Sequence, residues 1–274
     1  AWRVNTLENI RLPVRLGQDV FSKGYLEQET IQQTEEAFLR FKHVADNYGV
    51  QRMRAVATSA AREASNGSLW IERVMSASGI EIEIISGEEE ARLIHLAVVH
   101  ALNLKNKRTM LIDIGGGSVE VTISTGQNII STESYNMGTV RLLEKLDTKN
   151  NSKHPFGKLV REYAEAARYR IERDIGAEKI QVCAATGGNV EEIGRLRQKL
   201  FKGDSDRFVT LDELAELIAR LDRLSYEERI RKLKLRPDRA DVILPASIVL
   251  HMIASEAGVK QIAIPNVGLK DGIL

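Results

Sequence analysis

The sequence predicts an α/β protein built from two domains. The chain has 274 residues, which is enough for two cores of ordinary size. Strand-like and helix-like segments alternate over the N-terminal third, and a group of strands separated by glycine turns follows. A charged polar stretch at 103–108 separates the two regions, so the predicted domains are residues 1–107 and 108–274.

The N-terminal domain is predicted from hydrophobic periodicity and from helix-boundary signals. Apolar residues alternate with polar ones in the strands and recur at helical spacing in the helices. The predicted strands lie within 3–16, 53–58 and 80–85, and the predicted helices are 29–48 and 60–77. Ser86 followed by Glu89 has the pattern of a capping box, which predicts a further helix that ends near residue 103.

The C-terminal domain is predicted to open with an antiparallel meander. Its three strands, at 109–114, 119–124 and 129–135, are separated by glycine turns. The elements predicted to follow are helices at 139–146, 157–175, after Gly188 and at 240–257, and strands at 179–184 and 261–264. Two further capping boxes, Thr210 with Glu213 and Ser225 with Glu228, predict additional helix starts.

The composition indicates which partners the protein does not bind. The formal net charge is +1, so no bulk charge directs the chain to nucleic acid or to a membrane, and any site for a polyanion has to be local. Aromatic residues make up 5% of the chain, too few for the stacking platforms that bind single-stranded nucleic acid. Cys183 is the only cysteine and no apolar run is long enough to span a membrane, so we predict a cytoplasmic protein.

The clearest candidate site is the segment Asp-Ile-Gly-Gly-Gly-Ser-Val-Glu, from Asp113 to Glu120. It lies between two predicted strands, which excludes Rossmann and P-loop motifs because both need a helix after the glycines. Three glycines allow backbone N–H groups to approach an anion, and Ser118 adds a hydroxyl donor. The flanking carboxylates suit Mg²⁺, which prefers oxygen ligands. A tight hairpin with incidental acidic residues is the alternative interpretation.

A second candidate is the acidic run Glu88-Glu89-Glu90 at the start of a predicted helix. Acidic side chains at a helix N-terminus interact favourably with the helix dipole, and Glu89 completes the capping box, so helix stability explains much of the run. Glu90 lies one position past the cap and is not explained by it. If Glu90 faces a cleft, it is suited to accept a proton from an attacking water, as a general base does.

Three weaker features have both a structural and a phosphate-binding interpretation. The turn Thr186-Gly187-Gly188-Asn189 lies between a strand and a helix, where N–H groups suit phosphate, but such turns are common. Arg62 follows two hydroxyl residues that would either bind an anion or cap a helix. In the basic run 229–239 most side chains fit a solvated helix face, whereas Arg236 and Arg239 are suited to binding a polyanion.

Taken together, these motifs resemble the exopolyphosphatase and guanosine pentaphosphate phosphatase family, within the acetate and sugar kinase, Hsp70 and actin superfamily. The resemblance covers almost the whole chain, and its segments occur in the order that the family has. The segments are Ala57–Ala64, Ile84–Leu93, Asp113–Glu120, Thr186–Gly188, Arg239–Pro245 and Gly268–Gly272.

The resemblance implies two actin-like (ribonuclease H-like) domains with an interdomain cleft. It also implies Mg²⁺-dependent release of terminal orthophosphate from inorganic polyphosphate or from the guanosine alarmone pppGpp, and it is compatible with a homodimer. Glu90 would be the base that activates water from across the cleft, while Asp113 and Glu120 would bind or orient metal and water. The residues implied to bind phosphate are Gly115, Gly116, Gly117, Ser118, Thr186, Gly187, Gly188, Asn189, Arg62 and Arg239.

The chain differs from the family pattern at its start. Family members begin with a strand that ends in a phosphate loop of the type Asp-x-Gly-Ser-Asn-Ser, and this chain starts after that point. The resemblance therefore implies that the sheet of the first domain lacks a strand here.

Two other functions remain open at this point. A sensor that binds polyphosphate or an alarmone with little hydrolysis is the main alternative. An ATP-dependent kinase of the wider superfamily is the third, although a kinase needs a site for a substrate hydroxyl rather than a carboxylate that activates water.

Overall fold

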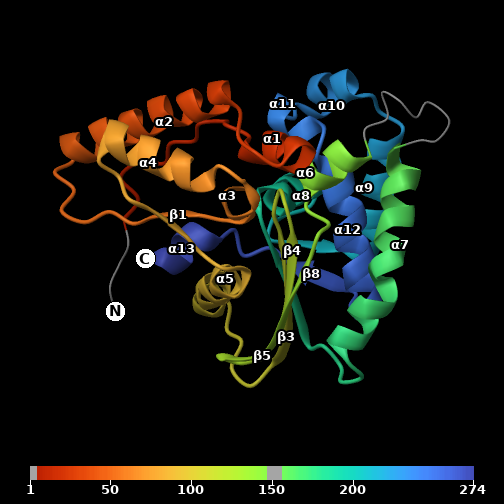
Figure 1. Cartoon of the computed structure of the whole chain (residues 1–274). Coiled ribbons are helices and arrows are strands. Elements are labelled where there is room, and N and C mark those ends of the chain that lie inside the picture. The colour runs from red at the N-terminus through yellow and green to blue at the C-terminus, as the bar shows by residue number, and fades with distance from the viewer. Residues whose placement is uncertain (1–4, 147–155) are drawn as a thin grey trace. The chain divides into compact units, whose positions relative to one another are not determined.

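The computed structural model describes residues 5–146 and 156–274 and divides the chain into two compact units, Ala1–Ile85 and Ser86–Leu274 (Figure 1). Each unit has its own hydrophobic core. The α/β class is confirmed in both units, because each combines a sheet with helices that pack against it. The expected cleft between two domains stays a prediction.

The first unit combines helices with a small parallel sheet. Its helices are α1 (Leu16–Lys23), α2 (Gln28–Asn47), α3 (Ser59–Glu63) and α4 (Gly67–Ser78), and its strands are β1 (Ala55–Ala57) and β2 (Ile82–Ile84). Trp70 of α4 is 2% exposed, and its indole N–H donates to the hydroxyl of Thr34 in α2 at 2.8 Å. This bond satisfies the polar end of a large apolar side chain and joins the two longest helices of the unit.

The prediction of strands within 3–16 is wrong for the described part of that segment. Residues 5–15 form neither helix nor strand, and α1 begins at Leu16. Leu7 and Ile10 stay 72% and 38% exposed. The alternating pattern therefore has no buried face to define a strand, and alternation without burial does not stabilise a sheet.

The second unit is built on a six-stranded sheet with the order β5-β4-β3-β6-β8-β7. The strands are β3 (Arg108–Ile114), β4 (Val119–Thr125), β5 (Asn128–Tyr135), β6 (Val182–Thr186), β7 (Phe208–Thr210) and β8 (Gln261–Ala263). Strands β3, β4 and β5 form the predicted antiparallel meander, whereas β6 is parallel to β3 and β8 is parallel to β6. The carboxyl ends of β3, β6 and β8 therefore lie at the same edge of the sheet.

Helices cover both faces of this sheet (Figure 1). The helices are α5 (Gly87–Ala101), α6 (Thr139–Lys145), α7 (Phe156–Ile175), α8 (Gly188–Leu200), α9 (Leu211–Asp222), α10 (Tyr226–Leu233), α11 (Pro237–Ala240), α12 (Ile243–Glu256) and α13 (Leu269–Ile273). Met110, Ile112 and Ile114 of β3 pack in the main core with residues of α7, α8 and α12. Leu111 faces the other way and packs with Ile94 of α5. Side chains of β3 thus alternate between a large core on one face of the sheet and a smaller core on the other face.

The boundary between the two units differs from the predicted one at 107/108. The division falls between Ile85 and Ser86 because α5 packs against β3, β4 and β5. The charged stretch before β3 is therefore only the connection between a helix and the strand it covers. Such connections are polar because they lie at the surface.

The helices predicted from the capping patterns at Ser86, Thr210 and Ser225 begin where expected. The capping boxes at Thr210 and Ser225 are both complete, with reciprocal bonds to Glu213 and Glu228. The predicted helix at 240–257 is α12, but it begins at Ile243. Pro245 then occupies the first turn, where its missing N–H costs no helical hydrogen bond. The sequence analysis did not predict β7, whose three residues are too few to show a period.

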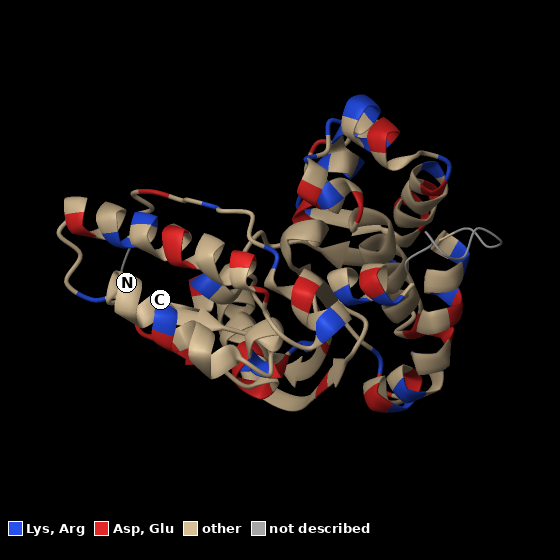
Figure 2. Cartoon of the chain, turned by 45° about the horizontal axis from the view of Figure 1, so that its top comes forward, with Lys and Arg blue, Asp and Glu red and all other residues tan. Residues whose placement is uncertain are grey.

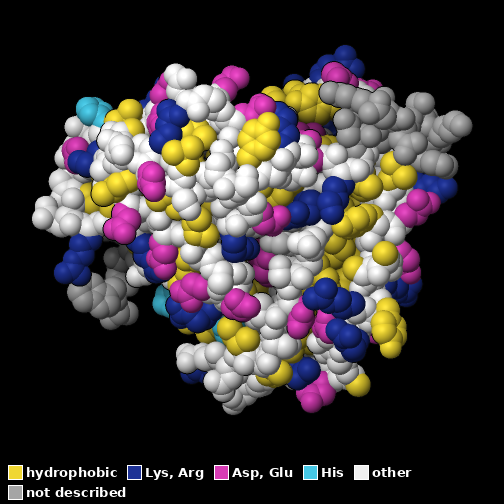
Figure 3. Space-filling view, in the orientation of Figure 1, with side chains coloured by type: hydrophobic (Ala, Val, Ile, Leu, Met, Phe, Trp, Pro, Cys, Tyr) yellow, Lys and Arg dark blue, Asp and Glu magenta, His cyan; other side chains and the backbone are white. Residues whose placement is uncertain are grey.

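The surface carries mixed charge. Lys and Arg residues are mixed with Asp and Glu residues along the helices in Figure 2, and the formal net charge of the whole chain is +1. Hydrophobic side chains on the face drawn in Figure 3 are interspersed with charged ones. Within the described residues, no helix has both the length and the apolar character required to cross a bilayer.

His95 of α5 is buried, and this makes the stability of the second unit sensitive to acid. Burial lowers the pKa of His95 below 6.5, although a hydrogen bond with the Gly126 backbone acts in the opposite direction. As the pH falls below 6.5, His95 is therefore protonated in the unfolded chain before it is protonated in the folded chain. We expect the free energy of unfolding to be constant above that pH and to decrease below it.

The measurement is urea unfolding of the wild type and of His95→Gln between pH 5 and pH 7.5. The variant should lose part of the acid-dependent decrease, whatever its stability at pH 7.5. His100→Gln is the matched control, because His100 is exposed on the same helix and that variant retains the buried His95. An unchanged pH slope in His95→Gln would contradict the assignment.

Candidate active site

Four polar side chains form one row across the sheet of the second unit. Asp113 of β3 is directly opposite Glu120 of β4 and Thr186 of β6, and Glu120 is opposite Ser134 of β5. Residues that are directly opposite on neighbouring strands point to the same face of a sheet. The row is therefore Ser134, Glu120, Asp113 and Thr186, on the face that α5 covers.

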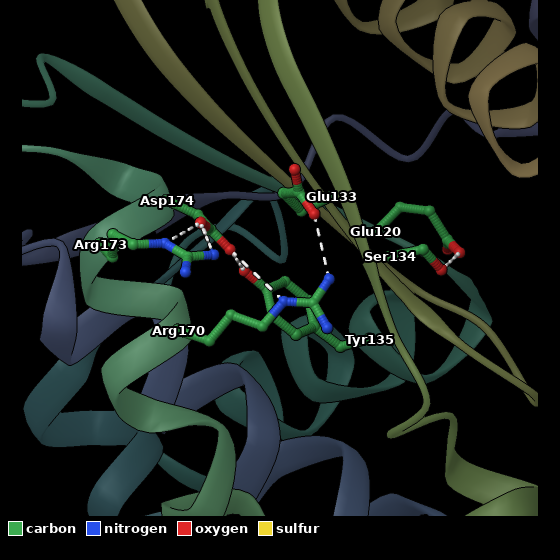
Figure 4. A network of polar contacts seen from close by, with 7 residues as sticks. All are labelled: Glu120, Glu133, Ser134, Tyr135, Arg170, Arg173 and Asp174. Atoms are coloured by element: carbon green, nitrogen blue, oxygen red, sulfur yellow. Dashed lines mark hydrogen bonds and ion pairs between the residues drawn. The ribbon is translucent and has the colours of Figure 1, made fainter.

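The two carboxylates of this row are buried and hydrogen-bonded. Asp113 is 8% exposed and Glu120 is 2% exposed. The Thr186 hydroxyl donates to Oδ1 of Asp113 at 2.5 Å. The Ser134 hydroxyl donates to Oε1 of Glu120 at 3.0 Å, as Figure 4 shows. Burial raises the pKa of the Asp113 carboxyl, and the bond from Thr186 lowers it in part. Two ionised carboxylates that are buried side by side are unfavourable unless a cation compensates their charge.

The glycine loop between β3 and β4 directs its carbonyl groups toward the start of α6. The Gly115 carbonyl accepts from the Thr139 amide at 3.1 Å, and the Gly116 carbonyl accepts from the Val140 amide at 2.9 Å. The Gly117 carbonyl accepts from Nε of Arg141 at 2.6 Å. The first amides of a helix have no acceptor within the helix. The loop carbonyls accept hydrogen bonds from these amides of α6, so the polar groups of both segments are paired.

The amide groups of the same loop point the other way. In a trans peptide the N–H lies opposite the preceding C=O, so the amides of Gly116, Gly117 and Ser118 face away from α6. Within the described part of the chain, none of these three amides donates to a protein acceptor. Three neighbouring N–H groups on one side of a bare loop form the kind of concave donor set that binds an anion.

Close packing fixes this loop. A Cβ added at Gly138 would lie 2.2 Å from the carbonyl carbon of Gly117, so only glycine allows α6 to start against the loop. Arg141 is buried, and its guanidinium binds the Gly117 carbonyl directly. The sequence analysis did not identify Gly138, Thr139 or Arg141. The signal that would have found them is the glycine that precedes a helix directly after the third meander strand.

Glu90 lies over the same sheet face as the two carboxylates. It is in the first turn of α5, on the helix stripe that continues through Ile94 and Val98, both of which pack with Leu111. Leu111 precedes Asp113 by two residues on β3 and therefore points to the same face. Only residues 102–107 connect α5 to β3, so the helix runs back along the strand and its N-terminus lies near the carboxyl end of β3. The Oε2 atom of Glu90 is buried there.

The placement of Glu90 corrects one expectation. We expected Glu90 in the N-terminal domain, across a cleft from the glycine loop, but it belongs to the same compact unit as the loop. The packing of α5 on the meander is the physical reason. Glu90 instead lies on the side of the sheet that carries Asp113 and Glu120.

The turn after β6 lies at the same edge of the sheet. Gly187 has φ +107°, and a Cβ there would lie 2.5 Å from the Ile114 carbonyl oxygen, so both conformation and space require glycine. Asn189 accepts from Nη1 of Arg239 at 3.0 Å and donates to the Thr139 hydroxyl at 3.3 Å. Arg239 also covers Gly188, where a Cβ would lie 2.1 Å from its Nη2. Asn189 thus connects Arg239 to the start of α6, a structural role that the sequence did not reveal.

Two of the predicted basic contacts have local partners. Arg62 belongs to the first unit, where its Nη1 donates to the Ile85 carbonyl at 2.6 Å, and its role in phosphate binding stays a prediction. Arg236 pairs with Asp238 at 2.6 Å. Arg229 is buried and donates to the carbonyls of Leu221 and Ala240. Arg229 is therefore structural rather than part of the solvated helix face that we predicted for most of the run.

The two carboxylates of the candidate site fit Mg²⁺, which keeps water ligands, better than a metal ion that is held by protein ligands alone. Among the described residues, no group of three or more His, Cys, Asp or Glu side chains is arranged to hold a metal ion. Asp113 and Glu120 are adjacent in the sheet register and supply carboxylate oxygens beside the glycine loop. Mg²⁺ is usually held by one or two carboxylates together with water and substrate phosphates, so these two residues fit it.

Comparison with known proteins shows the family of this chain. The model of the Ppx/GppA phosphatase family matches residues 3–274. The structure is similar to that of an exopolyphosphatase from Cytophaga hutchinsonii, with a TM-score of 0.90, 22% identity, and coverage of 98% of this chain and 88% of that one. It is also similar to a Ppx/GppA family member from Aquifex aeolicus, with a TM-score of 0.76, 24% identity, and coverage of 94% and 84%. The family match extends over nearly the whole sequence, and the chain therefore belongs to the Ppx/GppA phosphatase family.

Proposed function

We propose that this protein hydrolyses the terminal phosphoanhydride bond of inorganic polyphosphate and releases orthophosphate with the aid of Mg²⁺. The observation that supports this most is the juxtaposition of three outward amides in the glycine loop with the buried carboxylates Asp113 and Glu120. Family membership and the similarity to an exopolyphosphatase from Cytophaga hutchinsonii support the same reaction. The family description also includes GppA, so pppGpp is the second substrate to test.

Each residue of the site has one task in this reaction. The amides of Gly116, Gly117 and Ser118 bind oxygens of the terminal phosphoryl group, whose negative charge they complement. Asp113 and Glu120 would hold Mg²⁺, which neutralises phosphate charge when it is bound. Glu90 accepts a proton from water as the water oxygen bonds to phosphorus. The bridging P–O bond breaks, and the shortened polyphosphate leaves with the electron pair of that bond.

The test is phosphate release from long-chain polyphosphate, from pppGpp and from ATP, each with Mg²⁺ and with excess chelator. We expect Mg²⁺-dependent release from polyphosphate, and release from pppGpp if the site accepts a nucleotide. Tight calorimetric binding of polyphosphate without release would contradict the proposal and support a sensor. ATP consumption that depends on an acceptor would instead indicate a kinase.

A further inference from the structure

Ser134 makes a direct contact with one of the site carboxylates from the edge strand of the sheet. Its hydroxyl donates to Oε1 of Glu120 at 3.0 Å, and the two residues are directly opposite in the β4–β5 register (Figure 4). Glu120 is 2% exposed, so this bond is shielded from bulk water. A hydrogen bond to a buried charged group is worth more than one between neutral groups at the surface.

We propose that Ser134 is a positioning residue that fixes the Glu120 carboxylate for metal-assisted phosphate release. This inference rests on the function proposed above and extends it to a residue that the sequence analysis did not identify. A carboxylate that binds a metal ion through one oxygen needs the other oxygen oriented by a donor, and such partners affect metal affinity strongly. Ser134 supplies that donor on β5, as Thr186 does for Asp113 on β6.

The strand that carries Ser134 is held from its opposite face by α7. Side chains alternate along β5, so Glu133 and Tyr135 point away from Ser134. The Tyr135 hydroxyl donates to Oδ2 of Asp174 at 2.8 Å, and Arg170 pairs with Glu133 at 3.0 Å (Figure 4). The guanidinium of Arg170 also lies 5.0 Å from the centre of the Tyr135 ring. We call these four residues, Glu133, Tyr135, Arg170 and Asp174, the α7 clamp.

The pairing of β5 with β4 is irregular near the turn that joins them. β5 is an edge strand, and its register with β4 shifts between Ile123 and Ser124, close to the turn. The turn therefore does not by itself set which residue of β5 faces Glu120. A slip of one residue would turn Ser134 to the opposite face of the sheet. The continuous pairing of 119–123 with 131–135 holds this register, and the contacts of Glu133 and Tyr135 with α7 support it near Ser134.

The experiment compares Ser134→Ala with Ser134→Thr and with the control Thr132→Val. Thr132 lies on the same face of β5, and its hydroxyl contacts that of Thr122 at 3.1 Å, so the control removes a cross-strand hydroxyl away from the carboxylates. We measure kcat and KM for phosphate release, the melting temperature, and calorimetric binding of Mg²⁺ alone to the free protein. The calorimetric readout does not depend on turnover.

For Ser134→Ala we expect about tenfold weaker Mg²⁺ binding and about tenfold lower kcat, at a nearly unchanged melting temperature. Ser134→Thr should restore both because it returns the hydroxyl, and Thr132→Val should resemble the wild type. Wild-type Mg²⁺ binding and kcat in Ser134→Ala would overturn the inference. Absence of phosphate release by the wild type would instead refute the proposed function, so the two failures are distinguishable.

A second variant tests the α7 clamp. Tyr135→Phe removes the hydroxyl that binds Asp174 but keeps the ring under Arg170. We expect a change in Mg²⁺ binding with the same sign as in Ser134→Ala but of smaller size, because the register is loosened rather than the donor lost. Mg²⁺ binding equal to that of the wild type would show that β5 keeps its register without the bond to Asp174.

Discussion

Replacing Glu90 by Gln is expected to lower the rate of phosphate release by about 10²–10⁴-fold, the range that general acid–base catalysis contributes. Gln keeps the size of the side chain but does not accept a proton from water at neutral pH. Its effect on folding should be small, because removing one acidic charge from the first turn of α5 costs only about 0.3–1 kcal/mol. The measurements are kcat with polyphosphate and the melting temperature.

Glu88→Gln is the matched control for this experiment. Glu88 is in the same first turn and carries the same charge, but its side chain is exposed. The control should have the turnover of the wild type, with a melting temperature close to that of Glu90→Gln. Wild-type turnover in Glu90→Gln, or an equal loss in both variants, would refute the assignment of Glu90 as the base.

Replacing Gly138 by Ala should reduce the stability of the second unit and weaken binding at its proposed anion site. The added Cβ would lie 2.2 Å from the carbonyl carbon of Gly117 and 2.4 Å from the Ser118 amide nitrogen. Either α6 or the glycine loop has to move, and overpacking of this kind costs about 1–3 kcal/mol. Because that movement displaces the amides that we propose to bind phosphate, we expect orthophosphate affinity to fall at least about tenfold, or ~1.4 kcal/mol.

Urea unfolding and calorimetric titration with orthophosphate measure the two effects. Gly268→Ala is the control, because a Cβ at Gly268 has no atom within 4 Å and its backbone is extended. That variant should keep both the stability and the phosphate affinity of the wild type. If Gly138→Ala keeps both as well, the close packing of α6 on the loop does not position the amides.

Local sequence was sufficient for the centre of the site. The glycine turn between two apolar strands predicts a hairpin, and a hairpin places the residues at equal distances from its turn opposite each other. The structure pairs Asp113 with Glu120 accordingly. The capping pattern at Ser86 likewise predicts where α5 begins, and Ser86 accepts a hydrogen bond from the Glu89 amide. These features depend on contacts between residues that are close in the chain.

Other parts of the site depend on contacts between distant segments. The hydroxyl of Thr186 reaches Asp113 across 73 residues of chain, and Asn189 meets Arg239 across 50. Arg141 is a basic residue in a short helix, and only the packing of that helix on the glycine loop turns its guanidinium to the Gly117 carbonyl. Such partners have no local signal, because their meeting depends on how strands and helices are ordered in the sheet.

The sequence by itself determined the α/β class, the antiparallel meander, and the pairing of two acidic residues across a bare glycine turn. Periodicity, capping and turn chemistry act over a few residues, so they can be recognised along the chain. Only the tertiary structure decided that Glu90 belongs to the same unit as the glycine loop, that α6 takes up the loop carbonyls, and that Ser134 faces Glu120. The reason is that burial of α5 and α7 against the sheet sets these positions, and burial depends on the whole fold.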